Sequence, residues 1–267
     1  MWQLPGGGLD HAEHPEAAVV REFAEETGLT VAVAGLRDAV ADVTRYPDLE
    51  VALHTDRIIF DVTPTAGTLR DEVDRTSDLA AWFTPAEAAG LPLLPFTAEL
   101  LGLPVDPLPA RTARAPFGPA PTDRRQRFAA YGLVTDPAGR VLLTMIAEGY
   151  PGAGKWHLPG GGTDHGEQPA AGLLRELVEE AGQLGRVVEL LAVDNLHNPA
   201  ALGPEGRPLD WHGVRVIYRV LVDAPTEAVV TELAGGSTAR AAWFLPEQVN
   251  GLRLTDVAAL ATGRRGR

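Results

Sequence analysis

Three glutamates stand at helical spacing at two places in this chain. The first set is Glu22, Glu25 and Glu26, and the second set is Glu176, Glu179 and Glu180. Residues at i, i+3 and i+4 share one face of a helix, and two like charges about 4 Å apart repel by on the order of 4 kcal/mol at an effective dielectric near 20. A divalent cation relieves that repulsion, and carboxylate oxygens are ligands that Mg²⁺ and Mn²⁺ prefer. A lone acidic pair is usually a solvated surface, but the recurrence of the triplet predicts metal binding.

Three consecutive glycines precede each triplet. They are Gly6, Gly7 and Gly8 in the first case and Gly160, Gly161 and Gly162 in the second. Glycine lets the backbone turn sharply and approach a ligand closely, and free N–H groups at a following helix N-terminus favour anions. A cation held by carboxylates beside such a backbone suits a diphosphate, because the cation bridges phosphate oxygens and activates a water molecule. A single run of glycines would indicate a structural turn. The repeated pattern predicts a site for a phosphorylated ligand.

Helices must carry these glutamates. Pro15 suits the first position of a helix, and Gly28 suits the left-handed residue just beyond its end. In the second stretch, Leu173 and Leu177 supply an apolar stripe at helical spacing. The spacing therefore predicts an amphipathic helix behind each set of glycines.

The two stretches belong to a longer duplication. LPGGG, REFAEETG, HTDRIIFDV and AAWFTPAE return in the same order as LPGGG, RELVEEAG, HGVRVIYRV and AAWFLPEQ. This order predicts two tandem domains, residues 1–104 and 123–267, joined by a proline-rich linker at 105–122. Tryptophans recur at equivalent places and are expected to pack in the cores: Trp2, Trp82, Trp156 and Trp243.

The second copy has a lead-in that the first copy lacks. Phe128–Val134 and Arg140–Met145 have the composition of strands, and DPAGR between them predicts the turn of a hairpin. The first copy starts at Met1, where its own lead-in should already be ending. We therefore expect its sheet to lack two strands and the natural start to lie upstream. Missing strands expose a sheet edge and remove core, so the second domain is expected to carry most of the activity.

The composition limits the classes of partner that the protein is expected to bind. The net charge of −13 disfavours a nucleic-acid polymer, because such binding depends on Lys and Arg neutralising phosphates. The sequence contains no stretch of about 18 apolar residues, so no membrane-spanning helix is predicted. No secretory signal is visible. The chain has no cysteine, which fits a cytoplasmic location. A small phosphorylated ligand remains compatible with this charge if a cation accompanies it.

These residues together resemble the box of the Nudix hydrolases. That box reads Gly, five residues, Glu, seven residues, Arg-Glu, an aliphatic, any residue, Glu-Glu, any residue, Gly and an aliphatic. The first copy matches with Gly7, Glu13, Arg21, Glu22, Phe23, Glu25, Glu26, Gly28 and Leu29. The second copy matches with Gly161, Glu167, Arg175, Glu176, Leu177, Glu179, Glu180 and Gly182, and then has Gln183 in place of the aliphatic. This departure is expected to affect packing at the helix end rather than a ligand.

The resemblance implies an α/β fold, an α/β/α sandwich around a mixed sheet, in two tandem copies. It implies Mg²⁺-dependent cleavage of the diphosphate in a nucleoside diphosphate linked to another group, with Mn²⁺ as an alternative metal. The metal ligands would be the three glutamates of each box with the carbonyl of Gly161 or Gly7. Arg175 and Glu167, or Arg21 and Glu13, would orient the carboxylates.

Several alternatives stay open at this point. The general base is either a glutamate of the box or an acid before the AAWF strand, where the candidates are Asp71, Glu72, Glu227 and Glu232. A non-catalytic module that senses a nucleotide is the rival function, although intact glutamates favour catalysis. A homodimer is possible, as is a pseudo-dimer formed by the two copies within one chain.

Overall fold

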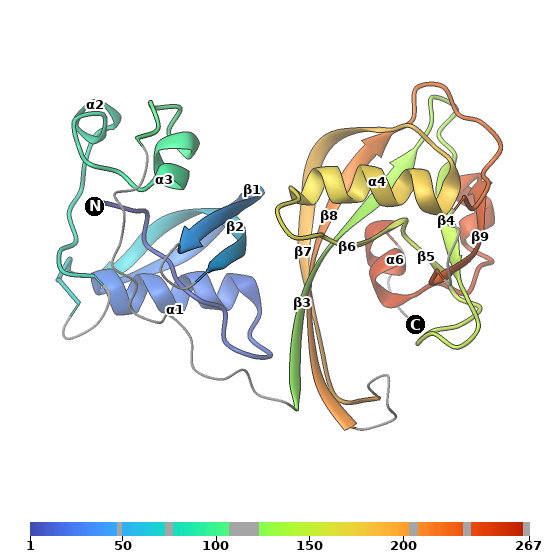
Figure 1. Ribbon diagram of the computed structural model, residues 1–267, viewed down its shortest axis with the longest axis horizontal. Helices are drawn as coiled ribbons and strands as arrows, with labels where there is room; N and C mark the ends of the chain where they lie inside the picture. Colours follow the sequence, from blue (N-terminus) through green and yellow to red (C-terminus); the bar gives the residue numbers. More distant parts are fainter. Residues whose placement is uncertain (47–49, 73–76, 107–122, 203–207, 232–235, 264–267) are drawn as a thin grey trace. The chain divides into compact units, whose positions relative to one another are not determined.

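The computed structural model describes residues 1–46, 50–72, 77–106, 123–202, 208–231 and 236–263 (Figure 1). The chain divides into two compact units. The first unit comprises residues 1–37 and 42–122, and the second comprises residues 38–41 and 123–267. Most of the expected linker, residues 107–122, lies outside the described residues, so the predicted domain boundaries stay a prediction. Within the described ranges, no helix is long and apolar enough to cross a membrane.

The first unit carries its glutamates on helix α1, Pro15–Thr27. Pro15 lies in the first turn, and the left-handed residue after the helix is Gly28 with φ of 72°, so the predicted ends are confirmed. The N-terminus is capped by the side chain of His14, which accepts a hydrogen bond from the Glu16 N–H at 3.2 Å. Such a cap satisfies one of the N–H groups that have no partner within the helix.

The other elements of the first unit are two strands and two short helices. They are β1 (Leu29–Tyr46), β2 (Val51–Gly67), α2 (Pro85–Ala88) and α3 (Pro95–Leu100). Strands β1 and β2 pair with each other in a two-stranded sheet. In the described residues this unit therefore builds its sheet from the two strands that follow the glutamate helix.

The second unit is built around a seven-stranded sheet. Its elements are β3 (Arg124–Thr135), β4 (Val141–Ile146), β5 (Trp156–His157), β6 (Gly160–Gly162), α4 (Pro169–Ala181), β7 (Arg186–Leu202), β8 (Pro208–Leu221), β9 (Thr238–Phe244), α5 (Pro246–Val249) and α6 (Asp256–Ala261). The strand order is β5-β4-β3-β8-β7, with β6 paired to β3 and β9 paired to β4. Strands β3 and β8 run parallel, and the other pairs are antiparallel. The mixed sheet of the predicted α/β class is confirmed.

Helices cover both faces of this sheet. A Cβ added at Gly132 on β3 would lie 3.2 Å from Leu173 of α4, so this face of β3 packs on α4 (Figure 1). Neighbouring residues of a strand point to opposite faces. On the opposite face, Ile217 of β8 packs in a core with Trp156, Val249 of α5 and Val257 of α6. The sheet is therefore the middle layer of an α/β/α sandwich.

The lead-in hairpin of the second unit forms as predicted. Val134 pairs with Leu142 and Thr135 pairs with Val141 across β3 and β4. At the turn, a carboxylate oxygen of Asp136 accepts hydrogen bonds from the backbone N–H of Arg140 at 2.8 Å. Gly139 takes φ of 77°, a conformation that favours glycine.

The glycines of the second unit differ from the prediction. They form strand β6 instead of a sharp turn, with Gly160, Gly161 and Gly162 opposite Tyr131, Ala130 and Ala129 of β3. Six residues, 163–168, then separate them from α4, so they do not lead directly into the helix. Gly160 takes φ of 131°, a conformation that favours glycine. The glycines by themselves do not show that β3 is their pairing partner.

The repeated AAWF segment folds differently in the two units. In the second unit, Ala241–Phe244 belongs to β9, which pairs with β4. In the first unit, Ala80–Phe83 is not a strand, and the described residues contain no strand opposite it. The side-chain environments of the equivalent tryptophans differ accordingly: Trp243 of β9 is partly exposed, whereas Trp82 is 67% exposed. The prediction that all four repeated tryptophans pack in a core is therefore wrong for Trp82.

Candidate functional site

Arg175 is the centre of the acidic cluster in the second unit. Its Nε and Nη2 donate to the two carboxylate oxygens of Glu167, each at 3.0 Å. Its Nη1 donates to Glu176 and to Glu179, each at 3.2 Å, and Nη2 also donates to the Gly162 carbonyl at 3.3 Å. One guanidinium thus gathers residues from β6, from the following loop and from α4.

This bidentate contact changes the acidity of both partners. The hydrogen bonds from Arg175 hold the pKa of Glu167 below its usual range, against the opposing effect of burial. Hydrogen bonding to Glu167 in turn raises the pKa of Arg175. Glu167 also accepts from the Asp164 N–H at 2.9 Å, which ties the loop after β6 to the cluster. Glu167 and Arg175 are therefore charged and mutually oriented.

Glu180 lies behind the cluster and is only 4% exposed. One of its carboxylate oxygens accepts from the Gly160 N–H at 2.9 Å. The other accepts from the hydroxyl of Thr238 on β9. Burying a carboxylate without hydrogen-bond donors is strongly unfavourable. The two donors therefore stabilise the buried side chain of Glu180 on α4.

The first unit repeats this arrangement around Arg21. Its guanidinium donates to Glu13 at 2.9 and 2.8 Å, to Glu22 at 2.7 Å and to the Gly8 carbonyl at 2.9 Å. Glu25 lies 3.6 Å from the same guanidinium. Arg21 therefore gathers Glu13, Glu22 and Glu25 as Arg175 gathers Glu167, Glu176 and Glu179.

Glu26 matches Glu180 in its contacts. It accepts from the Gly6 N–H at 2.8 Å and from the Ser77 hydroxyl at 2.9 Å. Ser77 precedes Ala80 of the first AAWF by three residues, and Thr238 precedes Ala241 of the second by three residues. Sequence reasoning missed this hydroxyl, although its fixed place before a repeated motif was a usable signal.

The middle glycine of each run is required by the neighbouring glutamate. A Cβ on Gly161 would lie 2.6 Å from a carboxylate oxygen of Glu176, and a Cβ on Gly7 would lie 2.4 Å from one of Glu22. Gly162 is crowded instead by the guanidinium of Arg127, 2.3 Å from the added Cβ. The glycines therefore allow protein side chains to approach the backbone closely.

The donor set fits a hard divalent cation. In the second unit, Arg175 is shared among Glu167, Glu176 and Glu179, so one positive charge faces several carboxylates. Glu176 is partly exposed, and Glu179 is more exposed than Glu176. These oxygens, with a remaining lone pair of Glu180, would hold Mg²⁺ or Mn²⁺.

The candidates for the general base lie in different surroundings. In the first unit, Glu72 accepts from the Ser77 N–H at 3.1 Å and is thereby linked to Glu26, whereas Asp71 accepts from the Ala80 N–H at 3.0 Å. Glu232 lies outside the described residues. The choice among these acids stays open.

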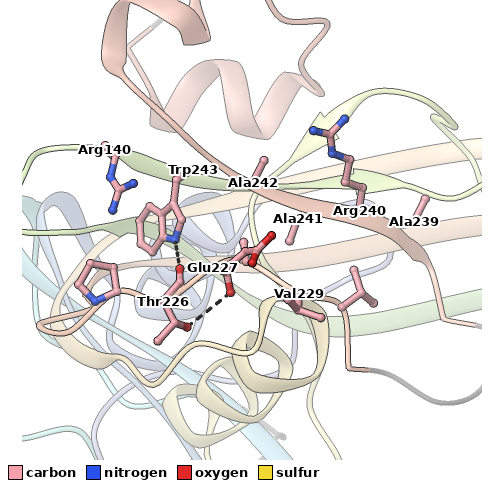
Figure 2. A pocket seen from close by; sticks show the side chains of 12 residues that line it. Arg140, Thr226, Glu227, Val229, Ala239, Arg240, Ala241, Ala242 and Trp243 are labelled. Atoms are coloured by element: carbon pink, nitrogen blue, oxygen red, sulfur yellow. Dashed lines mark hydrogen bonds between the residues drawn. The ribbon is translucent and has the colours of Figure 1, made fainter.

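Glu227 lines a pocket of about 780 Å³ between loop residues 225–230 and β9 (Figure 2). Trp243 and Arg140 line the same pocket, and the Trp243 indole N–H donates to the Thr226 carbonyl at 3.1 Å. Among the described residues that line it, none is a glutamate of the box. The pocket is therefore distinct in its lining from the acidic cluster.

Gln183, the departure from the box, holds the pocket loop. Its side chain is 1% exposed and donates to Thr226 Oγ1 at 2.9 Å and to the Glu227 carbonyl at 3.2 Å. It also accepts from the Thr226 N–H at 3.0 Å. Gln183 packs at the end of the helix as expected, and it does so through hydrogen bonds. Leu29, at the equivalent place in the first unit, is a buried apolar side chain.

A second pair that sequence reasoning missed lies on the sheet. Arg215 of β8 forms an ion pair with Asp194 of β7, its direct neighbour across the strands. In the first unit, Arg57 of β2 contacts Asp42 of β1 at 2.5 Å. Arg57 and Arg215 hold the same place in HTDRIIFDV and HGVRVIYRV, which was the signal available in the sequence.

Comparison with known proteins agrees with this geometry. A family model described as NUDIX domain matches residues 1–101 and 125–262. A "MutT-like protein" from Streptomyces ambofaciens is 38% identical over 88 residues, 33% of this chain and 51% of that protein. A "Putative 8-oxo-dGTP diphosphatase 3" from Mycobacterium tuberculosis is 38% identical over 97 residues, 35% of this chain and 42% of that protein. The chain spans about half the length of the curated relatives it matches.

Solved structures also match parts of this chain. A MutT protein from Methanosarcina mazei Go1 matches with a TM-score of 0.42 and 19% identity, over 54% of this chain and 94% of that chain. A MutT NUDIX hydrolase from Burkholderia pseudomallei matches with a TM-score of 0.39 and 27% identity, over 53% of this chain and 99% of that chain. Because the family model covers both copies of the box and most of the chain, this protein belongs to the Nudix family, with two Nudix regions in tandem.

Proposed function

We propose that this protein is a Mg²⁺-dependent pyrophosphohydrolase. It cleaves the diphosphate of a nucleoside diphosphate linked to another group, and the second unit carries most of the turnover. The observation behind this proposal is the gathering of Glu167, Glu176 and Glu179 around one guanidinium, next to the buried Glu180 and the glycine strand.

The residues of the second unit have separable roles in this proposal. Glu176, Glu179 and Glu180 would hold the cation, with the Gly161 carbonyl beside them. When bound, Mg²⁺ supplies charge neutralisation for the phosphate oxygens and lowers the pKa of a bound water. Arg175 and Glu167 keep the carboxylates oriented, because their bidentate contact fixes the loop after β6 against α4.

The names of relatives support the reaction class. Proteins called 8-oxo-dGTP diphosphatase in Mycobacterium tuberculosis and Proteus vulgaris, and an RNA pyrophosphohydrolase in Acidiphilium cryptum, align with parts of this chain. These names describe a diphosphatase for 8-oxo-dGTP and a pyrophosphohydrolase for RNA. The absence of cysteine and the net charge of −13 support a cytoplasmic protein with a small nucleotide-type substrate.

The sheet of the second unit is the reason to assign most of the turnover to that unit. The glycines of the second unit are paired with β3, whereas Gly6–Gly8 are not in a strand. A backbone held in a ladder keeps its carbonyls and N–H groups in place without further ordering on binding.

The experiment is a panel of nucleoside diphosphate derivatives and nucleoside triphosphates with Mg²⁺, assayed for release of phosphate or nucleotide. The full chain is compared with Glu180→Gln and with the matched variant Glu26→Gln. We expect Glu180→Gln to reduce turnover by about 100-fold or more, because a metal ligand and a buried charge are lost together, and Glu26→Gln to change it by less than twofold.

Two results would contradict the proposal. If Glu26→Gln reduces turnover as much as Glu180→Gln, the first unit shares the catalysis. If the full chain binds members of the panel with Mg²⁺ and releases nothing, the protein is a nucleotide sensor instead of an enzyme.

A further inference from the structure

Three segments border the β3–β4 hairpin of the second unit. Strand β8 and the glycine strand β6 both pair with β3, and strand β9, which contains the AAWF segment, pairs with β4. The repeat gives the first unit a counterpart of each border: strand β2, residues 6–8 and residues 80–83. Among the described residues of the first unit, β2 pairs with β1 alone, and the other two segments belong to no strand. The borders of a hairpin are therefore present there without a described hairpin between them.

The borders keep the same local contacts in both units. The rings of Trp2 and Phe83 meet edge to face with centroids 4.8 Å apart, and those of Trp156 and Phe244 do so at 4.7 Å. Gly6 takes φ of 147°, close to the 131° of its counterpart in the second unit. The first unit thus holds its borders much as the second unit holds them around the hairpin.

The space beside the glycines of the first unit is open. A Cβ on Gly160 would lie 2.2 Å from a backbone oxygen of β3, and a Cβ on Gly162 would lie 2.3 Å from the guanidinium of Arg127. A Cβ on Gly6 or Gly8 would meet no atom of the described residues within 4 Å. The part of the hairpin that crowds the glycines of the second unit therefore has no described counterpart in the first.

Apolar side chains along these borders lose cover in the first unit. Leu158 is fully buried, whereas Leu4, at the same place in the repeat, is 37% exposed. Four side chains of β2 are partly buried, whereas their counterparts on β8 are buried: Ile58, Ile59, Phe60 and Val62 against Val216, Ile217, Tyr218 and Val220. Covering these groups would remove apolar surface from water, which favours binding.

Charge also favours a hairpin of the β3–β4 kind. Residues 1–104 contain 18 Asp and Glu and six Lys and Arg, whereas residues 124–146 contain four Arg and one Asp. Opposite net charges accelerate encounter and help to select the partner. The first unit therefore suits a basic hairpin better than an acidic one.

We propose that the first unit binds a β-hairpin of a partner protein in a slot lined by residues 4–8, residues 80–83 and the edge of β2 at residues 57–63. The hairpin is basic and has the apolar pattern of β3 and β4. Its first strand runs parallel to β2 and its second strand antiparallel to residues 80–83, as β3 runs to β8 and β4 to β9. Backbone hydrogen bonds to these segments and burial of the apolar side chains provide the affinity. This binding does not depend on the proposed hydrolysis.

A labelled peptide of residues 124–146 tests the inference on the full chain. We expect saturable binding by fluorescence anisotropy, and no saturable binding of a scrambled peptide that keeps the composition and charge. On addition of the peptide, hydrogen exchange should slow in residues 4–8, 57–63 and 80–83, because their amides become covered or paired. Exchange in β9 of the second unit should not change.

Two variants of the protein block the slot in different ways. Leu4→Asp places a charge where the complex would bury it, and Gly8→Leu fills space that is open in the free protein. We expect each to weaken the peptide about tenfold or more. Leu101→Asp is the matched control, because Leu101 is 41% exposed and lies at the end of α3, outside the residues that line the slot. It should leave the affinity unchanged.

Four outcomes would overturn the inference. They are no binding of the peptide, equal binding of the scrambled peptide, unchanged affinity in both Leu4→Asp and Gly8→Leu, and slower exchange confined to the second unit. Light scattering adds a fifth. A dimer that excludes the peptide and that Leu4→Asp dissociates would assign the slot to a second copy of this chain instead of a partner protein.

Discussion

At the scale of single residues, every carboxylate of the acidic cluster accepts hydrogen bonds from a defined donor. Arg175 serves Glu167, Glu176 and Glu179, while Glu180 depends on Gly160 and Thr238. Charge-assisted contacts of this kind are among the stronger hydrogen bonds in proteins. Loss of Arg175 should therefore disturb three carboxylates together, whereas loss of Thr238 should disturb Glu180 alone.

Thr238 is expected to be a positioning residue for Glu180. Thr238→Val keeps the shape of the side chain but leaves a buried carboxylate oxygen without its donor, which costs about 1–3 kcal/mol. We expect kcat to fall about tenfold or more while KM changes little, and Thr238→Ser to restore most of kcat. Ser77→Ala is the matched change in the first unit and should leave turnover nearly unchanged. Equal impairment of Thr238→Ser and Thr238→Val would show that the hydroxyl is not what matters.

The Arg175–Glu167 contact predicts a pH dependence of stability. Because Arg175 holds the pKa of Glu167 below its unfolded value, near 4.3, the contact stabilises the fold above that value and loses its effect as pH falls through the folded pKa. We expect Arg175→Gln to lower the free energy of unfolding at pH 7, and the difference from the unmodified chain to shrink below about pH 4. Urea denaturation at pH 7, 5 and 3.5 measures this. A difference in unfolding free energy that is constant with pH would contradict this prediction. Arg21→Gln should also lower the free energy of unfolding at pH 7, because Arg21 likewise lowers the pKa of Glu13.

At the scale of elements, α4 is joined to the pocket loop by backbone and side-chain hydrogen bonds. The Val229 N–H donates to the Ala181 carbonyl at 3.1 Å, and the Thr231 N–H donates to the Glu179 carbonyl at 2.8 Å. Gln183 adds contacts to Thr226 and Glu227. These bonds satisfy carbonyls at the C-terminal end of the helix that have no partner within it.

Replacing Gln183 by the aliphatic residue of the family pattern should loosen this loop. Gln183→Leu removes the hydrogen bonds to Thr226 and Glu227, and we expect a loss of about 1–3 kcal/mol of stability. Hydrogen exchange should become faster in residues 225–231 without a comparable change in α1. Leu184→Ala is the control, because Leu184 is 82% exposed. Unchanged exchange in Gln183→Leu would mean that the backbone bonds alone hold the loop.

At the scale of the whole molecule, the two units differ in how much sheet supports the same site. The second unit has seven strands, and the described part of the first has two. A two-stranded sheet is marginal by itself, and the first unit leaves Trp82 exposed. The box of the first unit is complete, so the two units differ in the sheet that supports the box and not in the box residues.

We predict that residues 123–267 fold independently and residues 1–104 do not. The larger sheet buries apolar side chains on both faces, whereas the two-stranded unit has less surface to bury. Thermal unfolding of each fragment, followed by circular dichroism, measures this. Cooperative unfolding of residues 1–104, with a midpoint similar to that of residues 123–267, would contradict the prediction.

Much of the local structure was determined by the sequence itself. Pro15 and Gly28 marked the ends of α1, and DPAGR marked the hairpin turn, because these residues limit the backbone conformation directly. The box spacing placed Glu22, Glu25 and Glu26 together for the same reason, since helical spacing is a local property.

The contacts that these local pieces make depend on the assembled fold. Gly160–Gly162 became a strand because β3 pairs with them, and Ala80–Phe83 did not become one because no described strand lies opposite. Thr238 reaches Glu180, and Arg127 reaches Gly162, across 58 and 35 positions of sequence. Such contacts depend on which strands share a sheet and in which register, and a single sequence specifies these pairings only through the packing of the whole fold.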